Sequence, residues 1–307
     1  MRAVTISKYG DQSVLTYGDI ERPKPKSGEI LVHNRAVAVN PVDWKIRNGL
    51  GEMFGLQLPL VPGCEIAGII EEVSSGVQDF HPGDPVYGYV SLQRNGGYAE
   101  YTIAKPDEIA LKPESLDFDN AAAVPVGALT SWQAIFDTAD LRTGQKILVT
   151  GASGGVGSMA VQLAKAKGAY VIATASGKNE EFVRNLGADQ FVDYTRVHFE
   201  ESVHDVDVVF DTIGGDTQER SFETLRRGGC LVTVAMPPSN EKAEHYGVRA
   251  SMIGVQPSSK QLREVNRLIA EGKLKPHVAT VLPLSEVRKA HQLSESGRTR
   301  GKIILHP

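Results

Sequence analysis

Short apolar runs alternate with turn residues over the first 120 positions of the chain. The runs cover residues 29–39, 66–73, 85–90 and 98–104, and turns that contain glycine or proline separate them. Closely spaced short strands of this kind are typical of an all-β domain, either a barrel or a sandwich. The pattern therefore predicts a β-rich domain at the start of the chain.

Beyond residue 120 the pattern changes to strands that alternate with helices. Residues 121–133 are rich in alanine and predict a helix. Strands are then predicted at 146–150, 170–174, 191–194, 206–210, 231–235 and 250–255, and helices at 156–167, 178–186, 217–226 and 258–271. Repeated strand–helix–strand units predict a parallel sheet covered on both faces.

The last part of the chain returns to an extended pattern. Residues 278–284 and 302–305 predict strands, and a short helix is predicted between them at 284–293. We expect residues 275–307 to rejoin the first domain, so that the α/β segment is an insertion in a β-rich domain.

A glycine-rich turn joins the first strand of the α/β segment to its first helix. Ala152, Gly154 and Gly157 have the A-x-G-x-x-G spacing, with a predicted strand before it and a helix after it. In this context one glycine allows close approach of a pyrophosphate, another allows tight helix packing, and the helix N-terminus faces the phosphates. The alternative is a glycine-rich turn in an unrelated α/β protein. We predict a dinucleotide site at Ser153, Gly154, Gly155, Val156 and Gly157.

The end of the second strand of this segment indicates which dinucleotide binds. An NAD site usually has Asp or Glu there to bond the ribose 2′-hydroxyl. Here Ser176 and Lys178 occupy the region and no carboxylate is present. A hydroxyl and a cation suit a 2′-phosphate, so we favour NADP(H). Alternatively, Lys178 is a solvated residue of the next helix. Tyr194, at the end of the third strand, either flanks the same phosphate or packs.

Composition and charge exclude several classes of protein. The 307 residues include only two cysteines, Cys64 and Cys230, too few for a disulfide framework or a four-cysteine zinc lobe. Sparse cysteine favours a reducing compartment, and we expect a cytoplasmic location without a signal peptide. A net charge of −4 argues against nucleic acid or an anionic membrane as partner. No apolar stretch approaches the roughly 18 residues that span a bilayer.

Several motifs together resemble those of one known family. They lie at residues 39–45, 61–68, 83–87, 96–101, 151–157, 186–189, 210–214 and 301–305. The chain resembles the medium-chain dehydrogenase/reductase superfamily, in its zinc-free quinone oxidoreductase and alkenal/enone reductase branch. The resemblance implies a Rossmann doubly wound parallel sheet, with strand order 3-2-1-4-5-6, inserted into a GroES-like β-rich catalytic domain. The implied boundaries are 1–122 and 273–307 for the catalytic domain and 123–272 for the NADP-binding domain.

The resemblance also concerns a catalytic metal. Zinc-dependent relatives have a cysteine near Asn40, a histidine where Cys64 stands, and a further cysteine near Val126. This chain has too few of these ligands for zinc, so we expect no metal. Without a Lewis acid, oxidation of simple alcohols is disfavoured. Hydride addition to a quinone or an α,β-unsaturated carbonyl needs only hydrogen-bond donors for the developing charge. The side chains of Asn40 and Lys45 are candidate donors.

Further site residues follow from the resemblance alone. It implies that Asn40 and Asp43 lie beside the nicotinamide and its ribose, that Thr130 touches the nicotinamide, and that Ile213 and Ala235 lie near the reactive ring. The alternatives are loop caps for the first two, a helix residue for Thr130 and core residues for the last two. Tyr87, Tyr89 and Tyr98 are expected to pack, and no proton donor is assigned.

The expected function is therefore NADPH-dependent hydride transfer to a small electrophile, a quinone or an enone, without zinc. The resemblance implies a homodimer, in which the strand at 250–255 pairs across a twofold axis. The alternative function is a non-catalytic NADPH-binding sensor or interaction protein of the same fold.

Overall fold

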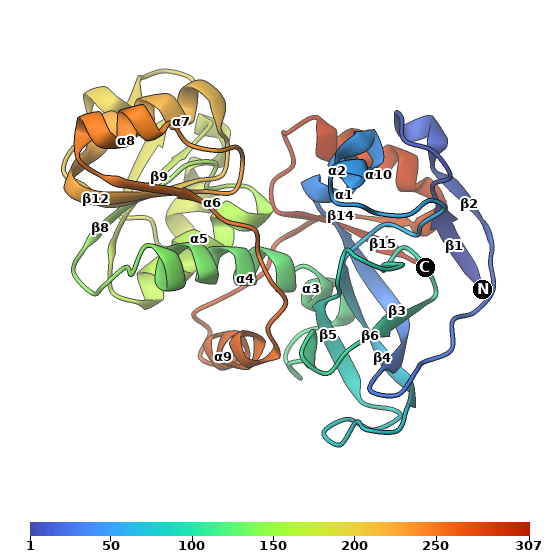
Figure 1. Cartoon of the computed structure of the whole chain (residues 1–307). Helices are drawn as coiled ribbons and strands as arrows, with labels where there is room; N and C mark the ends of the chain where they lie inside the picture. Colours follow the sequence, from blue (N-terminus) through green and yellow to red (C-terminus); the bar gives the residue numbers. More distant parts are fainter. The chain divides into compact units, whose positions relative to one another are not determined.

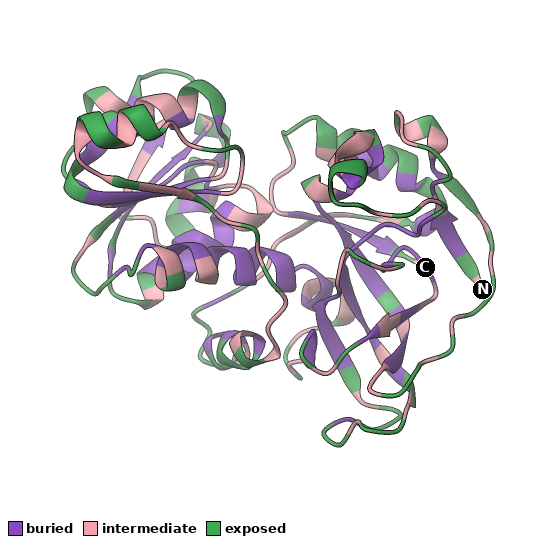
Figure 2. Ribbon diagram, in the orientation of Figure 1, coloured by how far each residue is buried: buried purple, intermediate pink, exposed green.

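A computed structural model describes all residues from 1 to 307, and the chain forms two compact units. The β-rich unit contains Met1–Val126, Pro257–Ala270 and Pro276–Pro307, and the α/β unit contains Gly127–Gln256 and Glu271–Lys275. Both chain ends thus lie in the β-rich unit, as the sequence pattern predicts. The central strands of both units are largely buried, whereas strands at the sheet edges carry exposed residues (Figure 2).

The β-rich unit is built on a seven-stranded sheet with the order β14-β15-β3-β4-β5-β7, in which β6 also pairs with β3. A separate two-stranded sheet pairs β1 with β2. The strands are β1 (Arg2–Thr5), β2 (Thr16–Asp19), β3 (Ile30–Val39), β4 (Glu65–Val73), β5 (Pro85–Tyr89), β6 (Tyr101–Ala104), β7 (Ile109–Leu111), β14 (Val278–Pro283) and β15 (Lys302–His306). The helices are α1 (Pro41–Lys45), α2 (Gly51–Met53), α3 (Phe118–Ala122), α9 (Ser259–Ala270) and α10 (Val287–Glu295).

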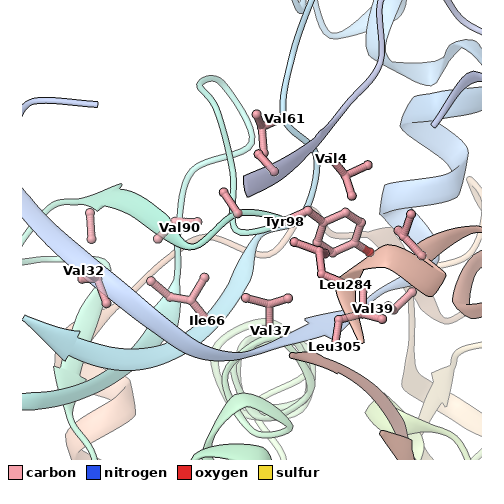
Figure 3. Packing of buried hydrophobic residues seen from close by; sticks show 14 of the residues in the cluster. Val4, Val32, Val37, Val39, Val61, Ile66, Val90, Tyr98, Leu284 and Leu305 are labelled. Carbon is pink, nitrogen blue, oxygen red and sulfur yellow. The ribbon is translucent and has the colours of Figure 1, made fainter. Parts of the chain in front are cut away.

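The core of this unit is formed by apolar side chains from the sheet and from α10. Figure 3 shows Tyr98 packed among Val4, Val39 and Leu284. The C-terminal strand β15 pairs antiparallel with β3, with Ile303 opposite Val39 and Leu305 opposite Val37. This pairing confirms the expected return of the tail to the first domain, and it brings residue 302 next to the end of β3.

The position of α9 differs from the boundary expected at 123–272. The helix belongs to the β-rich unit, because the buried hydroxyl of Tyr87 donates to the Leu262 carbonyl at 3.3 Å and to the Asn266 side chain. The Asn266 amide in turn donates to the Leu111 carbonyl at 2.9 Å. The amphipathic pattern of 258–271 predicts the helix but contains no information about which sheet it covers.

The α/β unit contains a six-stranded parallel sheet with the order β10-β9-β8-β11-β12-β13. Numbered within the unit, this is the expected order 3-2-1-4-5-6. The strands are β8 (Lys146–Val149), β9 (Tyr170–Ala175), β10 (Gln190–Asp193), β11 (Val206–Asp211), β12 (Leu225–Thr233) and β13 (Arg249–Met252). Within this unit, α5 (Gly155–Ala166) and α8 (Asn240–Tyr246) lie on opposite sides of the sheet (Figure 1), which confirms the doubly wound arrangement.

The remaining elements are short. They are the helices α4 (Pro125–Trp132), α6 (Glu180–Asn185) and α7 (Gly215–Ser221), the 3₁₀ helices Gln12–Val14, Gly177–Asn179, Phe199–Glu201, Phe222–Thr224 and Leu284–Glu286, and the π-helical segments Ile46–Leu50 and Gln133–Thr138. No helix combines the length and the apolar character that crossing a bilayer requires.

Two expectations for this unit were wrong in detail. The helix predicted at 217–226 ends earlier, because Leu225 already pairs with Val206 at the start of β12. The helix α8 was missed because its sequence is mostly polar. Its N-terminus is capped by Ser239, whose hydroxyl accepts the Lys242 N–H at 3.2 Å, and Tyr246 packs on the sheet core.

Candidate cofactor and catalytic sites

The glycine-rich turn follows β8 and leads directly into α5. Gly151 has a φ of +66°, a conformation that favours glycine, and Gly154 is the extended residue that precedes the helix. A Cβ on Gly157 would lie 2.3 Å from the Gly151 carbonyl oxygen, so this position requires glycine. The turn therefore has the tight packing that the sequence predicts for a phosphate loop, with the first N–H groups of α5 at its edge.

A side chain that the sequence analysis did not consider links this loop to the end of β9. The buried amide of Asn179 donates to the Ser153 hydroxyl at 3.1 Å and to the Ser176 hydroxyl at 3.2 Å. Two of the predicted cofactor residues are thus held beside one another. Asn179, three residues after Ser176, offered no recognisable signal in the sequence, because asparagine at the start of a helix is common.

A pocket of about 600 Å³ opens where β9 and β10 end. Its lining includes the predicted residues Ser176 and Lys178, and it adds Thr195 and Arg196 from the segment after β10. The full lining is Ser176, Gly177, Lys178, Glu180, Phe191, Asp193, Thr195 and Arg196. Tyr194 is 57% exposed and does not line the pocket, although residues on either side of it do. Two cations and two hydroxyls in one pocket suit a phosphate monoester.

Two carboxylates, Glu180 and Asp193, also line this pocket, and Glu180 is paired with Arg184 at 2.8 Å. The Asp193 side chain accepts the Thr195 hydroxyl at 2.7 Å and the Thr195 N–H at 3.0 Å, and these bonds lower the pKa of the Asp193 carboxyl. A Cβ on Gly177 would lie 2.4 Å from Asp193 Oδ2, so the carboxylate lies against this turn. We infer that Asp193 has a structural role, in which it holds the turns at Gly177 and Thr195 in place around the pocket.

The other predicted cofactor residues lie at separate places in the α/β unit. Ile213 follows β11 and is 55% exposed, and Ala235 follows β12 and is half-buried. The two loops are adjacent, because a Cβ on Gly214 would lie 3.0 Å from the Ala235 Cβ. Thr130 is buried on α4, next to Ser131, whose hydroxyl donates to the Val156 carbonyl at 3.0 Å. Their contacts with a nicotinamide remain a prediction.

In the β-rich unit, a buried polar cluster lies where β3, β4 and β15 meet. The Lys302 ammonium is 2.7 Å from Glu65 Oε2 and 2.5 Å from Asn40 Oδ1, and the Asn40 amide donates to Glu65 Oε2 at 3.0 Å. All three residues are at most 5% exposed. Strand pairing explains the meeting, because Ala38 lies opposite Glu65 and Ile303 opposite Val39. The second oxygen of Glu65 accepts the Val126 N–H at 2.8 Å.

Asp43 extends this cluster through the first turn of α1. Its Oδ2 accepts the Asn40 N–H at 2.7 Å and the Tyr98 hydroxyl at 2.8 Å, while Oδ1 is buried without a partner. Burial raises the pKa of Asp43 from an ordinary 3.8 to about 6, despite the two hydrogen bonds. Tyr98 therefore packs as expected, but its hydroxyl also has a defined partner.

The raised pKa predicts a pH-dependent stability. The folded state binds the Asp43 proton more tightly than the unfolded state, so the contribution of this group is most favourable below about pH 4 and is lost as the pH rises through about 6. Between pH 4 and pH 7 the loss is about 3 kcal/mol. We expect the unfolding free energy of Asp43→Asn, relative to the wild type, to rise by about this amount over that range. Urea titrations at each pH measure it, and a pH-independent difference would contradict it.

Comparison with known proteins shows the family to which the chain belongs. An alcohol dehydrogenase GroES-like domain model matches residues 26–114, and a zinc-binding dehydrogenase model matches residues 186–305. The chloroplastic NADPH-dependent alkenal/one oxidoreductase of Arabidopsis thaliana is 36% identical over 320 residues, covering 100% of this chain and 80% of that protein. The chain belongs to the medium-chain dehydrogenase/reductase superfamily, in its quinone and enone reductase branch.

Solved structures of this superfamily match along the whole chain. The quinone oxidoreductase from Coxiella burnetii is 34% identical with a TM-score of 0.94, covering 100% of this chain and 99% of that chain. A mycobacterial protein complexed with NADPH is 26% identical with a TM-score of 0.91, covering 100% of both chains. The resemblance inferred from the motifs is thus confirmed.

The positions that zinc-dependent members of the superfamily use for their metal do converge in this chain. The Asn40 amide is 3.9 Å from the Cys64 sulfur, and Val126 is hydrogen-bonded to Glu65. However, an amide, a valine and a single thiol do not form a zinc donor set. Burial also raises the pKa of the Cys64 thiol, which disfavours the thiolate that zinc would need. The Glu65 carboxylate is already paired with the Lys302 ammonium. These residues do not fit a catalytic zinc.

The structure groups the predicted catalytic residues differently from the sequence analysis. Asn40 and Asp43 share the buried cluster, but Lys45 does not contact it. The Lys45 side chain is half-buried at the end of α1, with its ammonium 5.8 Å from the Trp44 ring centre. The cation of the cluster is Lys302, which sequence reasoning missed. A lone lysine in the otherwise apolar strand 302–305 was the available signal.

Proposed function

We propose that this chain is an NADPH-dependent oxidoreductase that transfers hydride to quinones or α,β-unsaturated carbonyls without a catalytic zinc. The observation that carries the proposal is the pocket at the ends of β9 and β10, where Lys178 and Arg196 face a common space with Ser176 and Thr195. This set matches the 2′-phosphate that distinguishes NADPH from NADH. The names of the relatives support the same cofactor and the same acceptors.

The fit to a dinucleotide depends on the chain's own residues. The segment from Gly151 to Gly157 has no room for a side chain at either of these two glycines, and it leads into the 12-residue helix α5. It would hold the pyrophosphate, while Ser176, Lys178 and Arg196 would hold the 2′-phosphate. When bound, NADPH supplies the hydride. The loops at Ile213 and Ala235 would border the nicotinamide, together with Thr130.

The β-rich unit is proposed to supply the electrophile site. A conjugated carbonyl accepts hydride at carbon and develops charge on oxygen, which hydrogen-bond donors can stabilise without a metal. We propose Asn40, Asp43 and Lys45 for this region. The Asn40 amide hydrogens already face Glu65 Oε2 and the Ala38 carbonyl oxygen, and its backbone N–H donates to Asp43 Oδ2, so we propose that this residue acts by fixing the start of α1. Of these three residues, Lys45 is the only cation and the only one that is not buried.

A steady-state assay tests the proposal. Purified protein is given NADPH, in the presence of EDTA, with a panel of quinones, enals and enones, and absorbance at 340 nm is followed. We expect acceptor-dependent oxidation that the chelator does not abolish. Tight NADPH binding with no turnover across the panel would instead support a non-catalytic sensor. Loss of activity with EDTA and recovery with zinc would contradict the metal-free part.

Two further proposals concern assembly and location. In the six-stranded sheet β13 pairs only with β12, so its outer edge is available, and we propose that it pairs with a second copy across a twofold axis. Light scattering of the purified protein checks this, and a monomer would contradict it.

Cys64 and Cys230 are free thiols, which supports the proposed cytoplasmic location, and imaging of a tagged chain would test it.

A further inference from the structure

Asp211, the last residue of β11, is a buried carboxylate on which several groups converge. Its Oδ1 accepts the Thr150 hydroxyl at 2.9 Å and the Ile213 N–H at 3.1 Å. Its Oδ2 accepts the Thr233 hydroxyl at 2.9 Å and the Gln218 amide at 3.1 Å. The Gly214 N–H donates to both oxygens at 3.1 Å. The residue is completely buried, and all of these donors are neutral.

These bonds join the ends of the three central strands β8, β11 and β12. Each hydroxyl that donates to Asp211 also accepts a backbone N–H from a following loop. Thr150 accepts the N–H of Thr212 at 3.1 Å, and Thr233 accepts the N–H of Ala235 at 3.1 Å. Because the carboxylate can only accept, it forces both hydroxyls to donate inward and leaves their lone pairs for the loops.

The Gln218 amide completes the connection between the two loops. It donates to Asp211 Oδ2 and also to the Met236 carbonyl at 3.0 Å. One carboxylate thus fixes, directly or through a single intervening side chain, residues 212–214 after β11 and 235–236 after β12. These are the loops that contain Ile213 and Ala235.

We propose that Asp211 is a positioning residue for the nicotinamide end of the cofactor site, acting by holding the loops after β11 and β12 in one fixed arrangement. The inference rests on the proposed NADPH-dependent function. It assigns to Asp211 no contact with the cofactor or the substrate. The pocket formed by Ser176, Lys178 and Arg196 lies at other strand ends and is independent of Asp211.

The substitution Asp211→Asn tests the geometry with almost no change in shape. An amide nitrogen in place of Oδ1 would face the N–H groups of Ile213 and Gly214. In place of Oδ2 it would face the Gly214 N–H and the Gln218 amide. Either orientation opposes two donors, so one loop must move. The expected displacement affects only the nicotinamide end.

Asp207→Asn is the matched control. Asp207 lies at the opposite end of the same strand, where its carboxylate accepts the Lys146 N–H at 2.8 Å and the Arg226 guanidinium at 2.6 Å. It therefore also links strand ends through a backbone N–H, but far along β11 from the two loops. The free energy of unfolding can fall in both variants, whereas only Asp211→Asn should lower kcat/KM for NADPH.

Two ligands separate the ends of the site in the full-length protein. Adenosine 2′,5′-bisphosphate probes the adenosine half of the site, which includes the 2′-phosphate pocket but no nicotinamide, and NADPH probes the whole site. For Asp211→Asn we expect kcat/KM for NADPH to fall about 10- to 100-fold, mostly through kcat, because misplacement by about 1 Å is enough for such a loss. The Kd for adenosine 2′,5′-bisphosphate should stay within about twofold, as should both quantities in Asp207→Asn.

Each other outcome has a defined meaning. Equal losses for both ligands, or wild-type values in Asp211→Asn, would overturn the inference and leave the proposed function intact. If the wild type does not bind NADPH, the proposed function fails and the inference fails with it. If Asp211→Asn does not fold, Thr233→Val takes its place, because it removes only the hydroxyl between Asp211 and Ala235. It should show the same selective loss, and its absence would overturn the inference.

Discussion

Replacing Lys302 by methionine is expected to lower the unfolding free energy by about 3–5 kcal/mol at neutral pH, the usual effect of removing one partner from a buried ion pair. Glu65 is completely buried, and the Lys302 ammonium at 2.7 Å is the cation that compensates its charge. The variant would also leave Asn40 Oδ1 without its donor. Urea unfolding followed by circular dichroism measures the change.

Two control variants isolate the ion pair from general effects. Lys302→Met combined with Glu65→Gln removes both charges and should lose less stability than Lys302→Met alone. Lys289→Met breaks the exposed pair with Glu286, at 3.0 Å, and should change stability by less than about 0.5 kcal/mol. A Lys302→Met variant as stable as the Lys289→Met variant would contradict the interpretation of the cluster.

Removing both cations of the 2′-phosphate pocket is expected to abolish most of the preference for NADPH. In Lys178→Ala combined with Arg196→Ala, the ratio of kcat/KM for NADPH to that for NADH should fall about 100-fold or more, since each cation is expected to make a charge-assisted bond to the phosphate. The effect should be selective, because NADH has no 2′-phosphate and its kcat/KM should therefore not change. Lys178→Ala alone should raise KM for NADPH far more than for NADH.

Lys242→Ala is the matched control for this change in charge. Lys242 lies on α8 and is paired with Glu219 at 2.8 Å, and neither residue lines the 2′-phosphate pocket. Removal of the Lys242 side chain should leave the coenzyme ratio unchanged within about twofold. Equal effects on NADPH and NADH in the double variant would remove the physical reason for assigning NADP(H).

The features that could be predicted from the sequence are those encoded by neighbouring residues. Alternating strands and helices predicted the parallel sheet, the family resemblance implied its strand order, and the spacing of Gly154 and Gly157 predicted the phosphate loop. The end of β9 gave Ser176 and Lys178, which do line the pocket. The coenzyme-binding pattern is local because one strand, one turn and one helix form it.

The features that were missed depend on residues far apart in the chain. Lys302 meets Asn40 and Glu65 only because β15 pairs with β3, a register that no local pattern reveals. Arg196 joins Lys178 because β10 lies next to β9. The isolated lysine in a buried strand shows that a partner must exist, but not which one. Lys45 is the nearest lysine to Asn40 in sequence, but the cation that contacts Asn40 is Lys302.

Hydride transfer from NADPH is the central claim, and isotope labelling tests it most directly. NADPH carrying deuterium on the transferred position of the nicotinamide is oxidised by the wild-type protein with an enone or a quinone, beside unlabelled NADPH. We expect slower oxidation of the labelled coenzyme and, with an enone, a saturated ketone that carries the deuterium on its β-carbon. Tight binding of NADPH without acceptor-dependent oxidation by any quinone or enone would contradict it.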